Sequence, residues 1–252
     1  PVSPCKRSTR KIMSKRTAAG FTLVELSIVL VIIALLAGGL LLSVGAQQEQ
    51  AARSTTEKRI ADTIDALIGY AAANGRLPCP AAPATTGVEA PLGGGDCTND
   101  WNGFVPARTL SLGPTDINGY LLDAWDNPIR YAITNANADS FSTVNGMKTN
   151  WAGGLGPDLR VCNTGVGITG AGATAACAAG SALTDTAVAV VFSRGKNGGA
   201  APASTDEIAN GDADRVFVAH TPTTGANEFD DIVAWLSPNI LYNRLIAAGR
   251  LP

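Results

Sequence analysis

A long apolar run near the N-terminus, with one carboxylate at its start, constrains this chain more than any other feature. Residues 26–44 are apolar or small apart from two serines, and residues 28–42 contain no polar side chain. Glu25 lies directly before this run. A charge in hydrocarbon costs about 2.5–3.5 kcal/mol on insertion scales. A chain that places Glu25 there therefore needs an interaction that offsets the cost.

The length of the apolar run matches a membrane span. A bilayer core of about 30 Å takes roughly 20 helical residues, and a helix is expected because an isolated strand cannot satisfy its backbone groups in lipid. Six basic side chains and no acidic one precede Gly20. The positive-inside rule therefore keeps this basic segment in the cytoplasm and exports the rest of the chain.

Two simpler interpretations leave Glu25 unexplained. One is a secretory signal peptide, with a weak small-residue cleavage site at Ala46. The apolar run is longer than the usual signal-peptide core of about 7–15 residues. The other is a plain membrane anchor. Neither a signal peptide nor a plain anchor has a use for a glutamate at the mouth of its apolar segment.

The residues around Glu25 resemble a known leader sequence. The segment 15–26 reads Lys-Arg-Thr-Ala-Ala-Gly-Phe-Thr-Leu-Val-Glu-Leu, which is similar to the prepilin leader of type IV pilins and type II secretion pseudopilins. The resemblance implies that a prepilin peptidase removes residues 1–20 by cleavage after Gly20, and that Phe21 becomes the N-methylated terminus. It also implies an α+β pilin fold, in which a long N-terminal helix packs on a small antiparallel β-sheet domain with long loops.

Cleavage at this position would supply a partner for the carboxylate. The new α-amine at Phe21 would lie about one helical turn from Glu25, so the carboxylate can pair with its own terminus or with that of the next subunit. An unpaired buried charge would be strongly destabilising. We therefore interpret Glu25 as a residue that sets the register of stacked helices during assembly, and not as a catalytic acid.

Composition limits the functions of the exported part. The chain has 252 residues and a formal charge of −2, but the leader holds six of the 19 Lys and Arg and none of the 21 Asp and Glu, so its removal leaves −8. Nonspecific nucleic-acid binding needs clustered cations, and we expect no nucleic-acid partner. Abundant glycine and few aromatic residues indicate a loop-rich domain with a modest core.

The cysteines predict two disulfides. Cys5 lies in the leader, and the remaining four are Cys79, Cys97, Cys162 and Cys177. An even count in an exported domain is typical of disulfides, and three connectivities are possible. We favour Cys79–Cys97 and Cys162–Cys177, because each pair closes a short loop rich in Gly, Ala or Pro. The alternative, free or metal-binding thiols, is disfavoured because no pair has C-x-x-C spacing.

The rest of the chain divides into segments by periodicity and turn signals. After a membrane or filament-core helix at residues 21–46, apolar residues recur every three or four positions, which predicts an amphipathic continuation of the helix over 47–75. Residues 76–252 form the exported globular domain. Within it we expect loops over 76–119, strands at 129–133, 187–193, 216–218 and 229–236, a turn at 194–199 and a terminal helix at 239–248.

Three short motifs give a second, partial resemblance. They are Asp-Ala-Trp-Asp-Asn-Pro at 123–128, Phe-Ser-Arg-Gly-Lys-Asn-Gly at 192–198, and Asp-Asp-Ile with a later Trp at 230–235. They are similar to the major pseudopilin of type II secretion. Asp126 replaces the usual glycine, and the loop between Asn197 and Asp230 is much longer than in that family. The pattern suggests a diverged minor pilin or pseudopilin.

The same resemblance implies one metal site. In the major pseudopilin, aspartates of this loop hold calcium, and the corresponding residues are Asn197, Asp230 and Asp231, with Asn197 where an aspartate is expected. Calcium accepts amide oxygens, but the exchange lowers the charge of the site. Four further acidic residues of the loop could supply the difference: Asp206, Glu207, Asp212 and Asp214. The alternative is a solvated acidic loop, so calcium is the only cofactor that we consider.

Nothing in the sequence indicates catalysis. His220 is the only histidine, and no G-x-S-x-G motif accompanies it. We expect a structural subunit of a type IV pilus or type II secretion pseudopilus, with the prepilin peptidase and other pilins or pseudopilins as partners. It would lie in the bacterial inner membrane, N-terminus cytoplasmic before cleavage, and then in a periplasmic or extracellular filament. The alternatives are a filament-tip module for adhesion or DNA uptake and, less favoured, a secreted enzyme released at Ala46.

Overall fold

A computed structural model describes residues 20–202, 204–225 and 227–252, with backbone alone for residues 37–44. The predicted leader cleavage site borders this part, and the rest of the leader lies outside it. The chain divides into two compact units, the second of which spans Glu49–Pro252. The helices are α1 Leu23–Asn74, α2 Ala107–Leu110, α3 Ala136–Asp139, α4 Gly146–Thr149, α5 Thr205–Gly211 and α6 Pro238–Ala247, with short 3₁₀ turns at Pro83–Thr85, Trp151–Gly153 and Gly172–Thr174. The strands are β1 Gly103–Phe104, β2 Arg130–Ile133, β3 Leu159–Cys162, β4 Ala182–Ala187, β5 Ala189–Ser193, β6 Val216–Val218 and β7 Ile232–Leu236.

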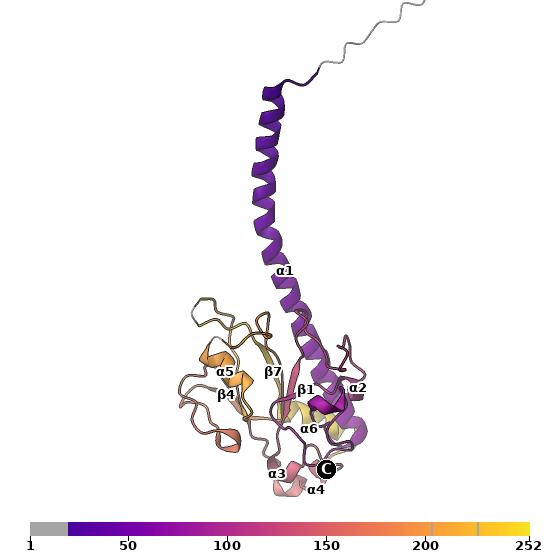
Figure 1. The fold of residues 1–252 in the computed structure, drawn as a ribbon. Helices are drawn as coiled ribbons and strands as arrows, with labels where there is room; N and C mark the ends of the chain where they lie inside the picture. Colours follow the sequence, from indigo (N-terminus) through magenta and orange to yellow (C-terminus); the bar gives the residue numbers. More distant parts are fainter. Residues whose placement is uncertain (1–19, 203, 226) are drawn as a thin grey trace, which may run out of the picture. The chain divides into compact units, whose positions relative to one another are not determined.

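The second unit is built around an antiparallel sheet with the strand order β1-β2-β5-β7. Successive residues of a strand point to opposite faces. On one face, Val191 belongs to the core cluster that includes Leu67 of α1. On the other, Phe192 belongs to the cluster that includes Phe217 of β6. The sheet is therefore covered by α1 and α6 on one side and by β3, β4 and β6 on the other (α1, α6 and β4 are labelled in Figure 1).

The second sheet has the order β4-β3-β6. β3 pairs with β4 in antiparallel register and with β6 in parallel register. The predicted α+β class, with a long N-terminal helix and a small antiparallel sheet, is confirmed. The pair is parallel because residues 163–215 lead the chain from the end of β3 back to its beginning, so that β6 runs in the same direction as β3.

Several predicted boundaries were wrong. The single strand expected at 187–193 is two strands, because the chain passes from one sheet to the other at Val188. Both strands are apolar at this junction, so no change of hydrophobicity marks it. The strand expected from Phe229 begins at Ile232, and the loop over 76–119 contains β1 and α2.

The outer part of α1 is attached to the domain by apolar and polar contacts. Ile60 and Leu67 are fully buried. Arg59 donates from Nη1 to the carbonyl oxygens of Leu122 (2.8 Å) and Asp123 (2.7 Å). The apolar residues of the predicted amphipathic helix thus face the sheet, while Arg59, directly before Ile60, binds the 122–123 segment.

The four cysteines of the second unit form the two pairs favoured by the sequence. Cys79 bonds to Cys97 with a Cα–Cα distance of 5.4 Å, and Cys162 bonds to Cys177 with a Cα–Cα distance of 5.7 Å. Cys79 lies in the main core, whereas Cys162 belongs to a small separate cluster with Val216. Each disulfide therefore stabilises a different part of the loop-rich domain.

A buried ion pair fixes the end of α1 to the first disulfide loop. Arg76 and Glu89 are each 4% exposed, and they share two hydrogen bonds of 2.7 Å. Glu89 also accepts from the Tyr70 hydroxyl (3.2 Å) and the Cys79 amide (3.2 Å). Burial acts to raise the pKa of Glu89, but the hydrogen bonds and charge of Arg76 outweigh it and hold that pKa below its usual value.

We predict that Glu89→Gln lowers the free energy of unfolding by about 3–5 kcal/mol, because it leaves Arg76 buried without a counter-charge. The measurement is urea denaturation of the full chain in detergent, followed by tryptophan fluorescence. The control is Asp62→Asn, which breaks the exposed Lys58–Asp62 pair of α1 and should cost about 0.3–0.5 kcal/mol.

The pH dependence of the same variant gives a second readout. Because the pKa of Glu89 is lower in the folded state, its contribution is present above the unfolded pKa, about 4.3, and is lost as pH falls through the folded pKa. Acid should therefore destabilise the wild type more than Glu89→Gln. Equal acid sensitivity of the two proteins would contradict the assignment.

Candidate functional site

The start of α1 shows how Glu25 is placed. Gly20 and Phe21 precede the helix, and the Phe21 side chain is 83% exposed. Thr22 caps the helix, since its Oγ1 accepts the Glu25 amide at 3.2 Å. Glu25 thus lies in the first turn, where a negative charge interacts favourably with the helix dipole. Leader cleavage after Gly20 and pairing of Glu25 with a new amine stay predictions.

The apolar side chains on both sides of Glu25 are exposed. Over residues 21–36 every apolar side chain is exposed, including Leu23 at 87% and Leu35 at 73%. An apolar surface of this kind marks an interaction site for protein or lipid. The predicted membrane segment over 21–46 extends into residues 37–44, whose side chains lie outside the described residues.

A search of the described residues finds no helix of sufficient length and hydropathy to cross a membrane.

In the second unit, the short motifs lie in contact with one another. The buried carboxylate of Asp123 accepts from the amides of Trp125 (2.9 Å) and Asn127 (2.8 Å) and from the Ser193 hydroxyl (2.6 Å). Burial raises the pKa of Asp123. Asn127 then donates from Nδ2 to the Gly195 carbonyl at 2.8 Å. The 123–128 motif therefore positions the turn that follows β5.

Asp126 is the residue that departs from the glycine of the resembling motif. Its φ is +65°, in the left-handed region. Glycine adopts this conformation without strain, and aspartate is one of the few other residues that visit it routinely. The exchange of glycine for aspartate therefore keeps the turn.

The turn after β5 encloses one carboxylate. The amides of Lys196 and Asn197 donate to Oδ2 of Asp230, at 2.9 and 3.2 Å. Gly195 has a φ of +60°, and a Cβ there would collide with the Asp230 carboxylate. The other oxygen, Oδ1, is buried and has no hydrogen-bond partner among the described residues. Such an atom is costly unless it has a ligand.

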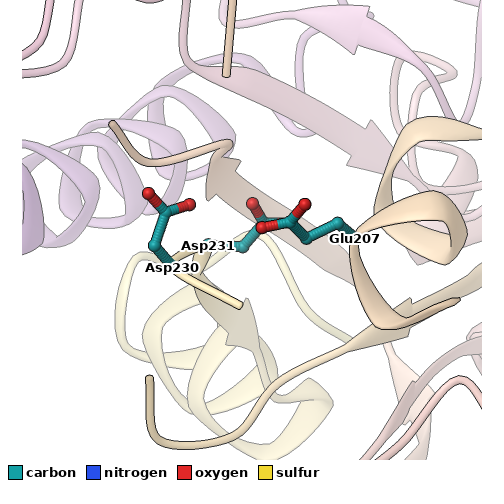
Figure 2. Close-up of side chains that lie close together, drawn as sticks. All are labelled: Glu207, Asp230 and Asp231. Atoms are coloured by element: carbon teal, nitrogen blue, oxygen red, sulfur yellow. The ribbon is translucent and has the colours of Figure 1, made fainter. Parts of the chain in front are cut away.

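Three carboxylates meet at this place. One oxygen each of Glu207, Asp230 and Asp231 lies within 4.8 Å of the others. Figure 2 shows Glu207 reaching from α5 toward Asp231, with Asp230 beside them in the segment just before β7. Glu207 is positioned by its helix, because its amide donates to the cap residue Ser204 at 3.2 Å.

Two of the three predicted calcium ligands therefore belong to this carboxylate cluster. Asp230 and Asp231 are in the cluster, and the third carboxylate is Glu207, one of the four further acidic candidates. Asn197 lies beside the cluster, since its Nδ2 donates to Glu207 Oε1 at 2.9 Å. The other acidic candidates have different contacts. Asp206 pairs with His220. Asp214 accepts a hydrogen bond from the Val216 amide and shares a side-chain hydrogen bond with Asp212.

Burial disfavours charge on the aspartates of the cluster. The pKa of Asp231 is raised to about 7, first by burial and then by the charges of Glu207 and Asp230, against the hydrogen bond from Asn210 Nδ2 (2.8 Å). Burial also raises the pKa of Asp230. A bound cation reverses this balance, because it favours the ionised carboxylates.

His220 has contacts of a structural kind. Its Nε2 lies 3.0 Å from Asp206 Oδ2, its Nδ1 lies 2.7 Å from the Thr221 carbonyl oxygen, and its ring stacks on Phe229 at 3.9 Å. Both ring nitrogens are therefore engaged, and within the described part of the chain no serine hydroxyl bonds to either. The histidine connects α5 to the segment that follows β6.

A comparison with protein families matches residues 15–41 to the prokaryotic N-terminal methylation motif. No curated protein and no solved structure matches the chain significantly. The match confirms the prepilin-type leader recognised in the sequence. It supports a type IV pilin-like or pseudopilin-like protein, which is a structural class, and it implies processing by a peptidase and assembly with other pilins.

We predict that Asp231 makes the domain less stable as pH rises from about 4 to about 7. Its folded pKa lies above the ordinary value of about 3.9, so the folded state binds more protons in this window and the free energy of unfolding falls with increasing pH. Urea denaturation in the presence of a chelator measures the slope. Asp231→Asn should flatten it, whereas Asp65→Asn, on the exposed face of α1, should not. An unchanged slope in Asp231→Asn would refute the prediction.

Proposed function

We propose that the chain is a structural subunit of a type IV pilus or a type II secretion pseudopilus. It would be assembled from the inner membrane after a prepilin peptidase cuts between Gly20 and Phe21. The observation that carries the proposal is the methylation motif at residues 15–41. The exposed apolar side chains over residues 21–36 support it, because a filament core or a bilayer would cover them.

The proposed mechanism is assembly. Cleavage frees an amine at Phe21, four residues before Glu25, and the carboxylate pairs with an amine terminus when the helix enters the growing filament. The pair lowers the cost of leaving Glu25 in an apolar environment. Since charge pairing depends on distance, it also favours one axial position of each helix against the next. The apolar side chains then pack between neighbouring helices.

The exported domain would form the outer surface of the filament. Its two disulfides suit a periplasmic or extracellular location, where disulfides persist. Its partners would be other pilins or pseudopilins, and the role needs no catalytic group.

We predict that Glu25→Ala abolishes filaments in cells that carry a prepilin peptidase and assembly machinery. Mass spectrometry should find N-methyl-Phe21 in both the wild type and the variant, because cleavage precedes assembly. Electron microscopy of sheared filaments measures the loss. Glu49→Ala is the matched control on α1, where the carboxylate forms only an exposed pair with Lys196. Normal filaments from Glu25→Ala would count against the registry role, and a mature chain that begins at Gln47 would end the pilin proposal.

We also propose that Glu207, Asp230 and Asp231 hold a calcium ion. The buried, unpartnered Oδ1 of Asp230 favours this over a solvated acidic loop. Calcium takes 6–8 oxygen ligands and accepts carboxylates, carbonyl oxygens and water, so three carboxylates can supply part of the shell. A bound ion would hold α5, the turn after β5 and the start of β7 together.

We predict that calcium raises the midpoint of thermal unfolding of the full chain in detergent. At a calcium concentration 100 times the Kd, ligand linkage stabilises the folded state by about 2.7 kcal/mol. Asp230→Asn should remove most of this response, and Asp185→Asn, exposed on β4, should keep it. No shift of the wild type at millimolar calcium would eliminate the site.

A further inference from the structure

Two arginines lie together at one end of the first sheet. The register places Phe104 of β1 opposite Arg130 of β2, and Arg130 opposite Phe192 of β5. Arg194 follows Phe192 by two positions, and residues two apart along an extended chain share a face. Arg130 and Arg194 are therefore diagonal neighbours on the face that packs against the second sheet, at the rim of that layer.

The Arg130 side chain is held in a defined orientation. Its guanidinium carbon lies 4.1 Å from the centre of the Phe104 ring, which in turn stacks on Tyr120 at 4.0 Å. Nη1 donates to Asn102, at 3.3 Å to the carbonyl oxygen and 3.1 Å to Oδ1. Nε and Nη2 donate no hydrogen bond within the described residues, so two donors remain available to a ligand. Stacking on an aromatic ring leaves the edge of the guanidinium free for such donation.

Arg194 approaches the same place from the other side. Its guanidinium packs against Gly211, where a Cβ would lie 3.6 Å from Nη2. The Gly211 carbonyl accepts from Asn102 Nδ2 at 3.3 Å. Asn102 thus contacts Arg130 directly and is tied to the residue beside Arg194. The two charges also influence one another. The pKa of Arg130 is lowered mainly by burial and, after that, by the charge of Arg194.

Neither guanidinium has a carboxylate partner within 4.0 Å among the described residues, although acids are plentiful in this chain. Three other arginines of the domain form ion pairs: Arg53 with Glu57, Arg76 with Glu89, and Arg215 with Asp158. At longer range the charge of Arg194 acts on Asp231, whose pKa it lowers. Two half-buried like charges that lie close enough for one to lower the pKa of the other still disfavour each other. The fold nevertheless holds them in place with an aromatic stack and a shared asparagine.

We propose that Arg130 and Arg194 form a binding site for an oxyanion. Guanidinium groups bind carboxylate and phosphate oxygens through parallel N–H donors, and the orientation of Arg130 is set before the ligand arrives. The ligand is either a free phosphate-like ion or a carboxylate from a second copy of this acidic chain. Both sources present the same chemistry to the arginines. The site contains no residue of the acidic cluster, although the charge of Arg194 acts on Asp231 and lowers its pKa, and it does not depend on the filament proposal.

The first experiment measures binding of inorganic phosphate to the full chain in a non-ionic detergent, at constant ionic strength with chloride as the reference anion. Isothermal titration should give a saturable signal for the wild type. Arg130→Gln and Arg194→Gln should each weaken binding at least tenfold, whereas Arg244→Gln, exposed on α6, should bind as the wild type does. Thermal unfolding without phosphate checks that every variant is folded.

The second experiment separates the two sources of the oxyanion by sedimentation. If the ligand is a carboxylate of a second copy, the wild type and Arg244→Gln associate with increasing concentration, phosphate reverses this association, and the two site variants lack the phosphate-sensitive part. If the ligand is a free ion, phosphate binds without any change of association state. Absence of saturable phosphate binding together with phosphate-insensitive association would overturn the proposal. So would equal behaviour of all three glutamine variants.

Discussion

The buried carboxylate of Asp123 determines the arrangement on which the candidate site depends. Its two oxygens accept three hydrogen bonds, from its own segment and from Ser193 at the end of β5. Its backbone carbonyl accepts from Arg59 of α1. One residue therefore joins the outer part of α1, the 123–128 segment and β5. A buried carboxylate with fewer donors would be strongly unfavourable, so this arrangement of the three segments is specific.

The consequences extend from Asp123 to the acidic cluster. Asn127, held by Asp123, bonds to the carbonyl of Gly195, and the turn beginning there encloses Asp230 with two amides. The carboxylates are thus presented by rigid neighbours, whereas a solvated acidic loop would let them separate. Arg194 directly precedes this turn, and its charge acts on Asp231. Acidic and basic sites therefore share one scaffold, and like charges are held together in each.

The leader, the long helix and the two disulfides were predictable from the sequence because each depends on residues close together in the chain. The prepilin-type segment 15–26 is contiguous, the apolar period of α1 repeats every three or four residues, and both disulfides close short loops. The strand boundaries were less predictable. At Val188 the chain changes sheets within an uninterrupted apolar run, and β4 is largely exposed, so it lacks the pattern of a buried strand. The segment from Thr205 to Gly211 forms a helix too short for periodicity to reveal.

The sequence by itself determined the leader, the long helix, the class of fold and two of the three residues in the acidic cluster. Only the tertiary structure decided which of the four further acidic candidates joins Asp230 and Asp231, namely Glu207, and that Arg130 and Arg194 are neighbours. The physical reason is the same in both cases. Glu207 and Asp231 belong to different elements, as do Arg130 and Arg194, and their separation in space depends on how sheet, turn and helix pack. Local propensity and spacing carry no information on such contacts, because each depends on burial and hydrogen bonds formed by residues far apart in the chain.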